Sequence, residues 1–340
     1  RGSDIAEPGS PTPAELARQV DVLVFSVPIR RTVAVIESCI AHADGGEAGA
    51  LWLDLTSIKQ APVAAMLGSR ADVAGLHPMA APPKIGTLEG RTLAVCRARV
   101  ARWGPWLDAL LAALRADCVE IAPAAHDRAM ALVQGLVHAS HLAQADVLRR
   151  CAAEAGGMPA LHALRTVGHE LDLTVTGRIL AGNPAIYEDI QFGNPDVLPV
   201  LERLADATAA LRDAVARGDE AARATLRQRF LAEPAAWFGA EALAARSHGF
   251  ERMGYLQADL DAARFLSVYL PEDRPGSLRA LLAVFERLGV NLASIHSSRT
   301  PEGELHFRIG LDRLPVSLAL LRAEVEDAGI GRVLEARDDA

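Results

Sequence analysis

Short, continuously apolar runs alternate with amphipathic segments in the first third of the chain. Continuous rather than alternating hydrophobicity is typical of strands that are buried on both faces. Helical patterns at 30–43 and 103–116 separate several of these runs. This order predicts βαβ units and hence a doubly wound, mostly parallel sheet. The runs are DVLVFSVP (21–28), ALWLDLTS (50–57), VAGLHP (73–78), TLAVC (92–96) and CVEIAP (118–123).

The pattern changes to alanine-rich amphipathic helices between residues 124 and 262, where we expect no strand. The tripeptide GNP occurs at 182–184 and again at 193–195. Each copy offers an Asn N-cap followed by a proline at the first helical position, so each predicts a helix start. A helical region this apolar usually packs against another surface, and a second copy of the chain is the natural candidate. We therefore expect an all-α domain over 124–262 and a homodimer.

Mixed structure returns in the last segment, over residues 263–340. FLSVYL (265–270) and ELHFRIGLD (304–312) have the pattern of strands, while 278–289 and 315–329 have the pattern of helices. With VNLASIHSSRT and RVLEAR as further strands, the order is βαββαβ, which is a ferredoxin-like unit. The sequence thus predicts three domains, 1–123, 124–262 and 263–340.

Charge and composition narrow the possible functions. The 340 residues contain 35 Lys plus Arg against 43 Asp plus Glu, a net charge of −8, which disfavours nucleic acid as a partner. A small anionic substrate needs only a local cation. The four cysteines lack the spacing of zinc or redox sites, so we expect reduced thiols and no metal. Without a run long enough to span a bilayer, the protein is expected to be soluble and cytoplasmic.

Polar and proline residues gather where three predicted parallel strands end, at Ser26–Pro28, Asp54–Ser57 and Leu76–Pro78. Ligands of such sheets bind outside the carboxyl ends of the strands. His77 at this edge could accept a proton near neutral pH, beside Ser57 from the neighbouring strand. The alternatives are a structural imidazole held by backbone groups, and hydroxyls that merely cap the following helix.

Three further features are candidates for binding. Arg178, on an otherwise apolar helix, could clamp a carboxylate or simply face solvent. His138 and His141 share a helix face, but carboxylates at metal-site spacing are lacking, and one of the two could reach a substrate cleft. Asp4 has the place of an acidic residue that holds a ribose. No GxGxxG precedes the first strand, so either the first βα unit is missing from this chain or the chain does not bind a dinucleotide in the usual way.

Four stretches together resemble the prephenate dehydrogenase family: DVLVFSVPIRRT, LWLDLTSIKQAPVAAML, GLHPMAAP and TGRILAGNPAIYEDI. The resemblance covers about residues 20–250. FLSVYLPEDRPGSLRALLAVFERLGVNLASIHS is similar to an ACT domain, an amino-acid-sensing module. The resemblance implies a Rossmann-like domain, N-terminally truncated, then a helical dimerisation domain and an ACT domain.

The resemblance also implies a reaction, the oxidative decarboxylation of prephenate to 4-hydroxyphenylpyruvate, CO2 and NADH in tyrosine biosynthesis. His77 would accept the proton of the 4-hydroxyl, Ser57 would orient that hydroxyl, and Arg178 would hold a carboxylate. By the same family pattern His138 and Tyr187 lie near the substrate. NAD would lie near Asp4, Ser26, Val27, Pro28, Asp54 and Thr56, and an aromatic amino acid effector near Asp273, Pro275, Gly276, Ser277 and Asn291.

Alternative functions remain open at this stage. The substrate could be arogenate rather than prephenate, as in arogenate or cyclohexadienyl dehydrogenases, or the chain could be a non-catalytic amino-acid sensor. A β-hydroxyacid dehydrogenase is excluded, because those enzymes resemble one another in using a lysine on the central helix and no lysine follows Lys84. An acidic Asp4 at the ribose would repel a 2′-phosphate and favour NAD over NADP.

Overall fold

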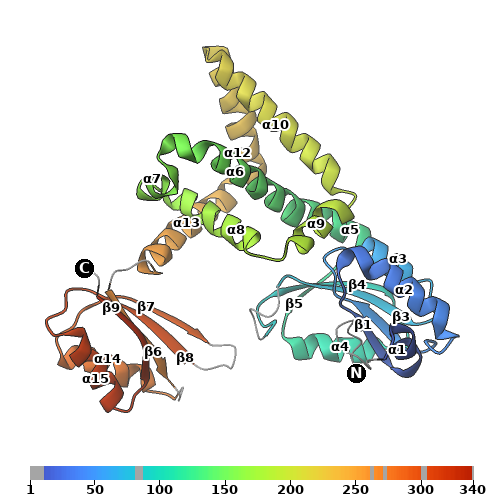
Figure 1. Ribbon diagram of the computed structural model, residues 1–340, viewed down its shortest axis with the longest axis horizontal. Coiled ribbons are helices and arrows are strands. Elements are labelled where there is room, and N and C mark those ends of the chain that lie inside the picture. Colours follow the sequence, from blue (N-terminus) through green and yellow to red (C-terminus); the bar gives the residue numbers. More distant parts are fainter. Residues whose placement is uncertain (1–10, 81–86, 261–263, 271–273, 300–304, 339–340) are drawn as a thin grey trace. The chain divides into compact units, whose positions relative to one another are not determined.

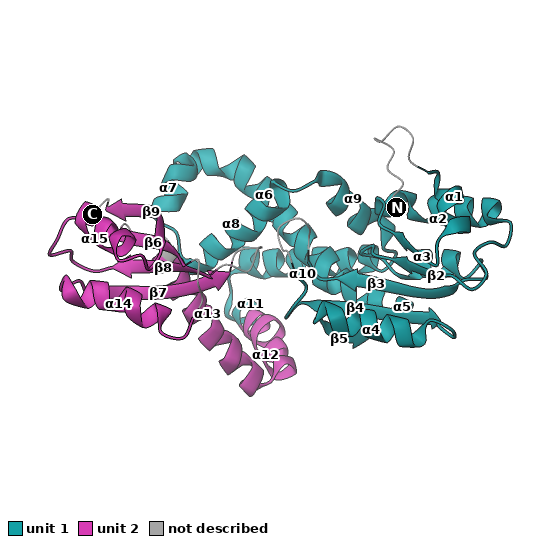
Figure 2. Cartoon of the chain, turned by 90° about the horizontal axis from the view of Figure 1, so that it is seen from below, with its two compact units in different colours: residues 1–223 teal, residues 224–340 magenta. Residues whose placement is uncertain are grey.

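The computed structural model describes residues 11–80, 87–260, 264–270, 274–299 and 305–338. The chain forms two compact units, residues 1–223 and 224–340, coloured separately in Figure 2.

The first unit opens with a five-stranded sheet in the order β1-β2-β3-β4-β5 (Figure 1). The pairs β1–β2, β2–β3 and β4–β5 are parallel and β3–β4 is antiparallel. The predicted Rossmann-like, mostly parallel sheet is therefore confirmed. Its strands are β1 (Val22–Phe25), β2 (Leu51–Asp54), β3 (Asp72–Pro78), β4 (Thr92–Arg99) and β5 (Asp117–Glu120).

Helices cover both faces of this sheet. On one face α1 (Pro13–Gln19), α2 (Ile29–Ala43) and α3 (Gln60–Met66) enclose a core that includes Phe25, Ile36 and Trp52. On the other face α4 (Gly104–Leu114) packs Leu107 and Leu111 onto β2 and β3. All four residues of β2 are buried, which explains why its sequence, LWLD, is continuously apolar up to Asp54.

The rest of the first unit is helical. The chain stays helical from Pro123 to Cys151, through a π-helical stretch at Ala131–Leu136. Such stretches are uncommon and are frequent at functional sites. The helical elements are α5 (Pro123–Met130), η1 (Ala131–Leu136), α6 (Val137–Cys151), η2 (Ala152–Ala155), α7 (Gly157–Ala163), α8 (Val167–Leu180), α9 (Pro184–Gly193), α10 (Val197–Arg217) and α11 (Glu220–Thr225).

One of the two GNP helix starts is confirmed and the other is wrong. Asn183 caps α9, because its side chain accepts a hydrogen bond from the backbone N–H of Ala185, and Pro184 follows at the first helical position. The second asparagine, Asn194, ends α9, and α10 begins two residues later than predicted, with Asp196 as its N-cap. The side-chain oxygen of Asn194 still accepts the backbone N–H of Asp196 (3.0 Å), and its amide nitrogen also donates to the backbone carbonyl of Asp127 (2.8 Å), so this side chain makes a local and a tertiary contact together.

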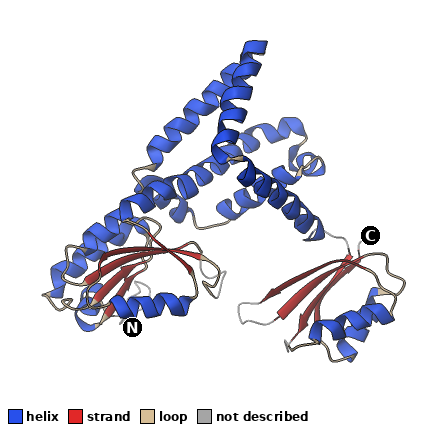
Figure 3. Cartoon of the chain, turned by 180° about the vertical axis from the view of Figure 1, so that it is seen from behind, coloured by secondary structure: helices blue, strands red, loops and turns tan. Residues whose placement is uncertain are grey.

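The second unit contains the predicted βαββαβ domain. Its sheet has the order β7-β8-β6-β9 with every pair antiparallel, and α14 and α15 cover one face (Figure 3). Leu266, Phe285 and Ile309 lie at the centre of its core. The elements are η3 (Leu226–Ala232), α12 (Glu233–Phe238), α13 (Ala240–Leu260), β6 (Arg264–Leu270), α14 (Ser277–Arg287), β7 (Leu292–Arg299), β8 (Leu305–Leu311), α15 (Leu318–Asp327) and β9 (Arg332–Asp338).

Within the described residues, no helix is both long enough and apolar enough to cross a membrane.

β2, β3 and α3 approach one another so closely at Gly75 that a larger side chain would not fit there. A Cβ atom at this position would lie 2.8 Å from Val63 Cγ2 and 3.0 Å from Asp54 Oδ2. We predict that Gly75→Ala lowers the free energy of unfolding by about 1–3 kcal/mol, the usual cost of overpacking a core, as measured by urea denaturation. Gly104→Ala is the control, because no described atom beyond its chain neighbours and its own helix backbone lies within 4 Å of the added methyl group. Equal stabilities for the two variants would contradict this account of β3.

Candidate active site

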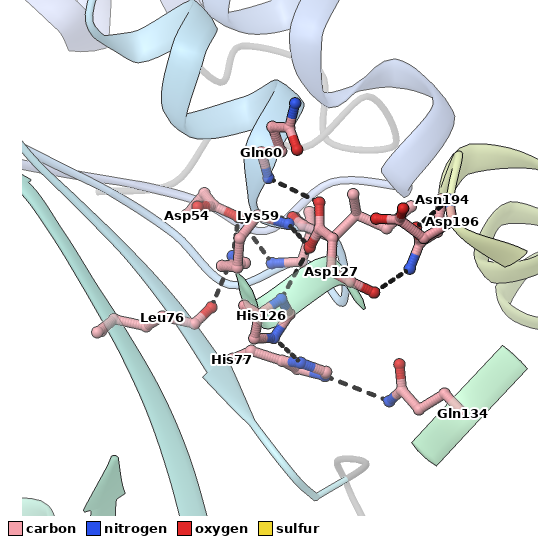
Figure 4. Close-up of polar contacts among 12 residues, drawn as sticks. Asp54, Lys59, Gln60, Leu76, His77, His126, Asp127, Gln134, Asn194 and Asp196 are labelled. Atoms are coloured by element: carbon pink, nitrogen blue, oxygen red, sulfur yellow. Dashed lines mark hydrogen bonds and ion pairs between the residues drawn. The ribbon is translucent and has the colours of Figure 1, made fainter. Parts of the chain in front are cut away.

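His77, the next-to-last residue of β3, is almost fully buried, with 3% of its surface exposed. Figure 4 shows its ring pointing toward two residues of the helical region. Its Nδ1 lies 3.0 Å from Nε2 of His126, and its Nε2 lies 3.4 Å from Nε2 of Gln134. The strand thus delivers the imidazole to the sheet edge, and side chains from outside the sheet enclose it.

His126 and Asp127, adjacent residues of α5, continue this chain of contacts into the protein. Nδ1 of His126 lies 2.8 Å from Oδ1 of Asp127, and both side chains are buried. The Asp127 carboxylate also accepts the backbone N–H groups of Lys59 (2.7 Å) and Gln60 (2.9 Å). These are unpaired donors at the start of α3, so the carboxylate caps that helix. Asp127 therefore joins the α3 start to the imidazole pair.

Lys59 and Asp54 form an ion pair beneath the site, and both side chains are completely buried. Lys59 Nζ also donates to the backbone carbonyl of Leu76 (2.8 Å), the residue before His77, and Thr56 Oγ1 donates to Asp54 Oδ1 (2.6 Å). Burial raises the pKa of Asp54 and lowers the pKa of Lys59, and each partner's charge opposes the shift of the other. Through the hydrogen bond from Lys59 to the carbonyl of Leu76, the pair fixes the end of β3.

Burial also controls the charge of His77. The pKa of His77 is lowered to about 3, mainly by desolvation and also by His126 and Lys59, while Asp127 opposes the shift. At neutral pH the imidazole is therefore uncharged, and a neutral imidazole has one nitrogen lone pair that can accept a proton or a hydrogen bond. This is the state that a general base requires.

The π-helical stretch supplies Gln134, which faces Nε2 of His77. Gln134 belongs to this stretch, and its Oε1 is buried without a hydrogen-bond partner among the described residues. The next residue, Gly135, leaves no room for a side chain, because an added Cβ would lie 2.7 Å from Val197 Cγ2. Its carbonyl accepts a hydrogen bond from Gln191 Nε2 (2.9 Å).

The predicted substrate residues of the helical region gather around Tyr187. Its ring contacts His138 edge to face, with centroids 5.0 Å apart, and its hydroxyl lies 3.4 Å from the backbone carbonyl of Arg178. Nδ1 of His138 is buried without a partner in the described structure, and burial, with His141 adding to it, lowers the pKa of His138. The Arg178 side chain is exposed at the end of α8.

The predicted residues of the sheet edge differ in exposure. Ser57 is half-buried in the turn after β2, and none of the hydrogen bonds among described residues joins it to His77. Ser26 and Pro28 are exposed after β1, and Val27 is half-buried. Asp54 and Thr56 are buried within the lysine network instead of facing an exposed edge.

The remaining predicted residues fall in other places. Asp4 and Asp273 lie outside the described residues. In the second unit, Pro275 is exposed and Gly276 has a φ of 101° directly before α14, a conformation that favours glycine. Ser277 is the first residue of α14, and Asn291 is exposed before β7 with its side chain 3.4 Å from Asp312 Oδ2.

Sequence reasoning missed His126 and Gln134, which contact His77, and the Asp127 and Asn194 contacts behind them. The available signal was the His-Asp pair at the start of the first helix after the last sheet strand. Two consecutive ionisable residues in an apolar helical context usually need burial partners, and here the partners are His77 and the α3 start.

Three family models match the chain. The nucleotide-binding domain of prephenate dehydrogenase matches residues 7–100, the prephenate dehydrogenase dimerization domain matches residues 122–229, and the ACT domain matches residues 264–320.

Individual proteins are also similar to this chain. A 4-amino-4-deoxyprephenate dehydrogenase from Streptomyces pristinaespiralis is 33% identical over 66% of this chain and 73% of its own length. A probable arogenate/prephenate dehydrogenase from Methanocaldococcus jannaschii is 27% identical over 67% of this chain. Among solved structures, prephenate dehydrogenase from Aquifex aeolicus has a TM-score of 0.49 and 16% identity, covering 65% of this chain and 80% of that one.

The matched part spans 50% of the length of the Methanocaldococcus jannaschii protein and 50% of a T-protein from Enterobacter agglomerans, which is 28% identical over 57% of this chain. The domain models, found in the order of the observed fold, and the Streptomyces pristinaespiralis relative together establish the family. The chain belongs to the prephenate dehydrogenase family and carries an ACT domain at its C-terminal end.

Proposed function

We propose that this protein catalyses the NAD-dependent oxidative decarboxylation of prephenate to 4-hydroxyphenylpyruvate, CO2 and NADH. The observation that carries the proposal is His77, a buried and neutral imidazole at the carboxyl end of a parallel strand. One of its nitrogens is engaged by His126, and the other faces a helical region that has unpartnered polar atoms. A base so placed can accept a proton from a substrate held between sheet edge and helices.

The sheet edge fits a nicotinamide cofactor. The carboxyl ends of β1, β2 and β3 meet at one edge, which is where cofactors bind in open parallel sheets. Ser26 and Pro28 are exposed there, and we assign them, with Val27, to cofactor contacts. When bound, NAD supplies the acceptor for the hydride that leaves C4 of the substrate. Asp54 and Thr56 are buried behind this edge, where Thr56 donates to Asp54 and Asp54 pairs with Lys59.

His77 and Ser57 would act on the 4-hydroxyl of the substrate. His77 accepts the proton of the 4-hydroxyl as the hydride departs, so that the electrons of the O–H bond form the carbonyl that later becomes the phenol. Ser57 orients the hydroxyl at the neighbouring strand end. Loss of CO2 from C1 makes the ring aromatic and drives the reaction forward.

Arg178 is assigned to a substrate carboxylate. Its side chain is exposed in the last turn of α8, and its backbone carbonyl lies 3.4 Å from the Tyr187 hydroxyl. Its planar fork suits bidentate binding of a carboxylate. The unpartnered Nδ1 of His138 is available to the pyruvyl group of the substrate. Side-by-side kinetics with prephenate and arogenate, each with NAD and NADP, would establish the preferred pair.

The domains that match the chain support a proposal for its assembly and regulation. We assign the helical region, matched by the family's dimerization domain, to a homodimer contact, and the ACT domain to binding of an aromatic amino acid effector. Pro275, Gly276, Ser277 and Asn291 are our candidates for the effector site, with Asp273.

We predict that His77→Asn lowers kcat about 10²- to 10⁴-fold, the usual contribution of a general base, with little change in NAD affinity. NADH formation from prephenate measures the first quantity and fluorescence titration the second. His42→Asn, an exposed histidine at the end of α2, is the matched control and should keep normal turnover. Near-normal turnover in His77→Asn would refute the assignment.

Removal of Arg178 should act on substrate binding. We expect Arg178→Ala to raise KM for prephenate about 10- to 100-fold, because a hydrogen bond between charged groups contributes about 1.5–3 kcal/mol, while kcat changes little. Arg217→Ala, which removes an exposed arginine in the last turn of α10, should leave KM unchanged. An unchanged KM in Arg178→Ala would place the carboxylate clamp elsewhere.

Calorimetry tests the effector proposal directly. We expect tyrosine or phenylalanine to bind the full chain, and Asn291→Ala to weaken that binding about 10-fold through loss of hydrogen bonds to the charged amino acid. Leu320→Ala, an exposed residue of α15, serves as the control. Absence of heat with both amino acids would reject an aromatic effector.

A further inference from the structure

The buried contacts beside His77 restrict where protons can lie. Both oxygens of Asp127 accept backbone N–H groups, Oδ1 from Lys59 and Oδ2 from Gln60. A backbone N–H can only donate, and an ionised carboxylate can only accept. The remaining partner of Oδ1 is Nδ1 of His126 at 2.8 Å, so this nitrogen must carry the proton of that hydrogen bond.

The tautomer of His126 then fixes the tautomer of His77. A neutral imidazole that is protonated on Nδ1 has its lone pair on Nε2. Nε2 of His126 lies 3.0 Å from Nδ1 of His77, so that contact is a hydrogen bond only when His77 donates from Nδ1. The lone pair of His77 is thereby left on Nε2. The amide nitrogen of Gln134, a donor, faces this same atom at 3.4 Å, in agreement with the assignment.

We propose that His126 and Asp127 are positioning residues that hold His77 as the Nδ1–H tautomer, with the lone pair on Nε2, where the substrate hydroxyl would replace Gln134 as the donor. This inference rests on the proposed function, in which His77 is the base. As the hydroxyl O–H bond breaks, its proton forms a bond to Nε2 of His77, while the proton on Nδ1 stays in place and continues to donate to His126. No second proton has to move.

Asp127 is the group of this arrangement that favours an imidazolium at His77, to which it is connected through His126. Burial and the Lys59 ammonium, which is paired with the Asp54 carboxylate, oppose that charge. Because that Asp127 carboxylate also caps α3, the orientation of the base is coupled to the contact between α5 and the sheet domain.

Two substitutions of His126 separate positioning from structural support. The amide of His126→Asn can replace Nδ1 and still donate to Asp127, but it is too short to reach His77. The longer His126→Gln can place its amide oxygen where Nε2 accepts from His77. We expect His126→Asn to lower kcat about 10- to 100-fold, the usual loss when an orienting partner is removed, with KM little changed. His126→Gln should recover most of that loss.

The alternative pattern would overturn the proposal. If His126 serves only to hold α5 in place, the asparagine variant, which keeps the Asp127 hydrogen bond, should be the more active of the two. Thermal unfolding of both variants shows whether either loss of activity follows from loss of fold.

A measurement on the unsubstituted protein is independent of activity and of any folding defect in the variants. In long-range ¹H–¹⁵N spectra of histidine-labelled protein, the His77 resonances are those absent from His77→Asn. We expect Nε2 of His77 at the shift of an unprotonated nitrogen and Nδ1 at that of a protonated one, at neutral pH. The reverse tautomer, or an imidazolium at His126, would overturn the inference. The expected tautomer without turnover of any cyclohexadienyl substrate would refute the proposed function alone.

Discussion

The carboxylate of Asp127 is the group on which the site depends. It is fully buried, and three donors compensate its charge: two backbone N–H groups at the start of α3 and the ring of His126. A buried carboxylate without such donors would be strongly destabilising. Its own backbone carbonyl accepts a hydrogen bond from Asn194, at the end of α9. One residue therefore connects the sheet domain, the long helix and α9 around the imidazole that we assign to catalysis (Figure 4).

The buried ion pair of Lys59 and Asp54 has a different role from the Asp127 carboxylate. Lys59 and Asp54 lose all hydration, and pairs of this kind often contribute little net stability, although removal of one partner is costly because the other charge is left alone. The pair instead restrains the backbone beside His77. Lys59 holds the carbonyl of Leu76, so the strand residue before His77 cannot rotate freely. Asp127 orients the His77 ring from the helical side, and Lys59 fixes its backbone from the sheet side.

Much of the fold could be predicted from local sequence, and particular elements show why. LWLD is apolar without alternation because β2 is covered on both faces, and the Asn183-Pro184 pair starts α9 because capping is a local interaction. At Asn194 the same local interaction forms, because its side-chain oxygen accepts the N–H of Asp196, yet α10 begins only at Val197. The amide nitrogen of Asn194 contacts Asp127, 67 residues away, and a local pattern does not predict that contact.

The sequence alone determined that His77 ends a buried parallel strand, that a helical region follows, and that an ACT-like unit closes the chain, because hydrophobic period and turn residues are local properties. The tertiary structure decided which side chains meet that histidine. His126 lies 49 residues away on another element, and its distance from His77 depends on how α5 packs on the sheet domain. Burial, proton position and the pairing of Lys59 are likewise properties of packed side chains, so only the folded chain specifies them.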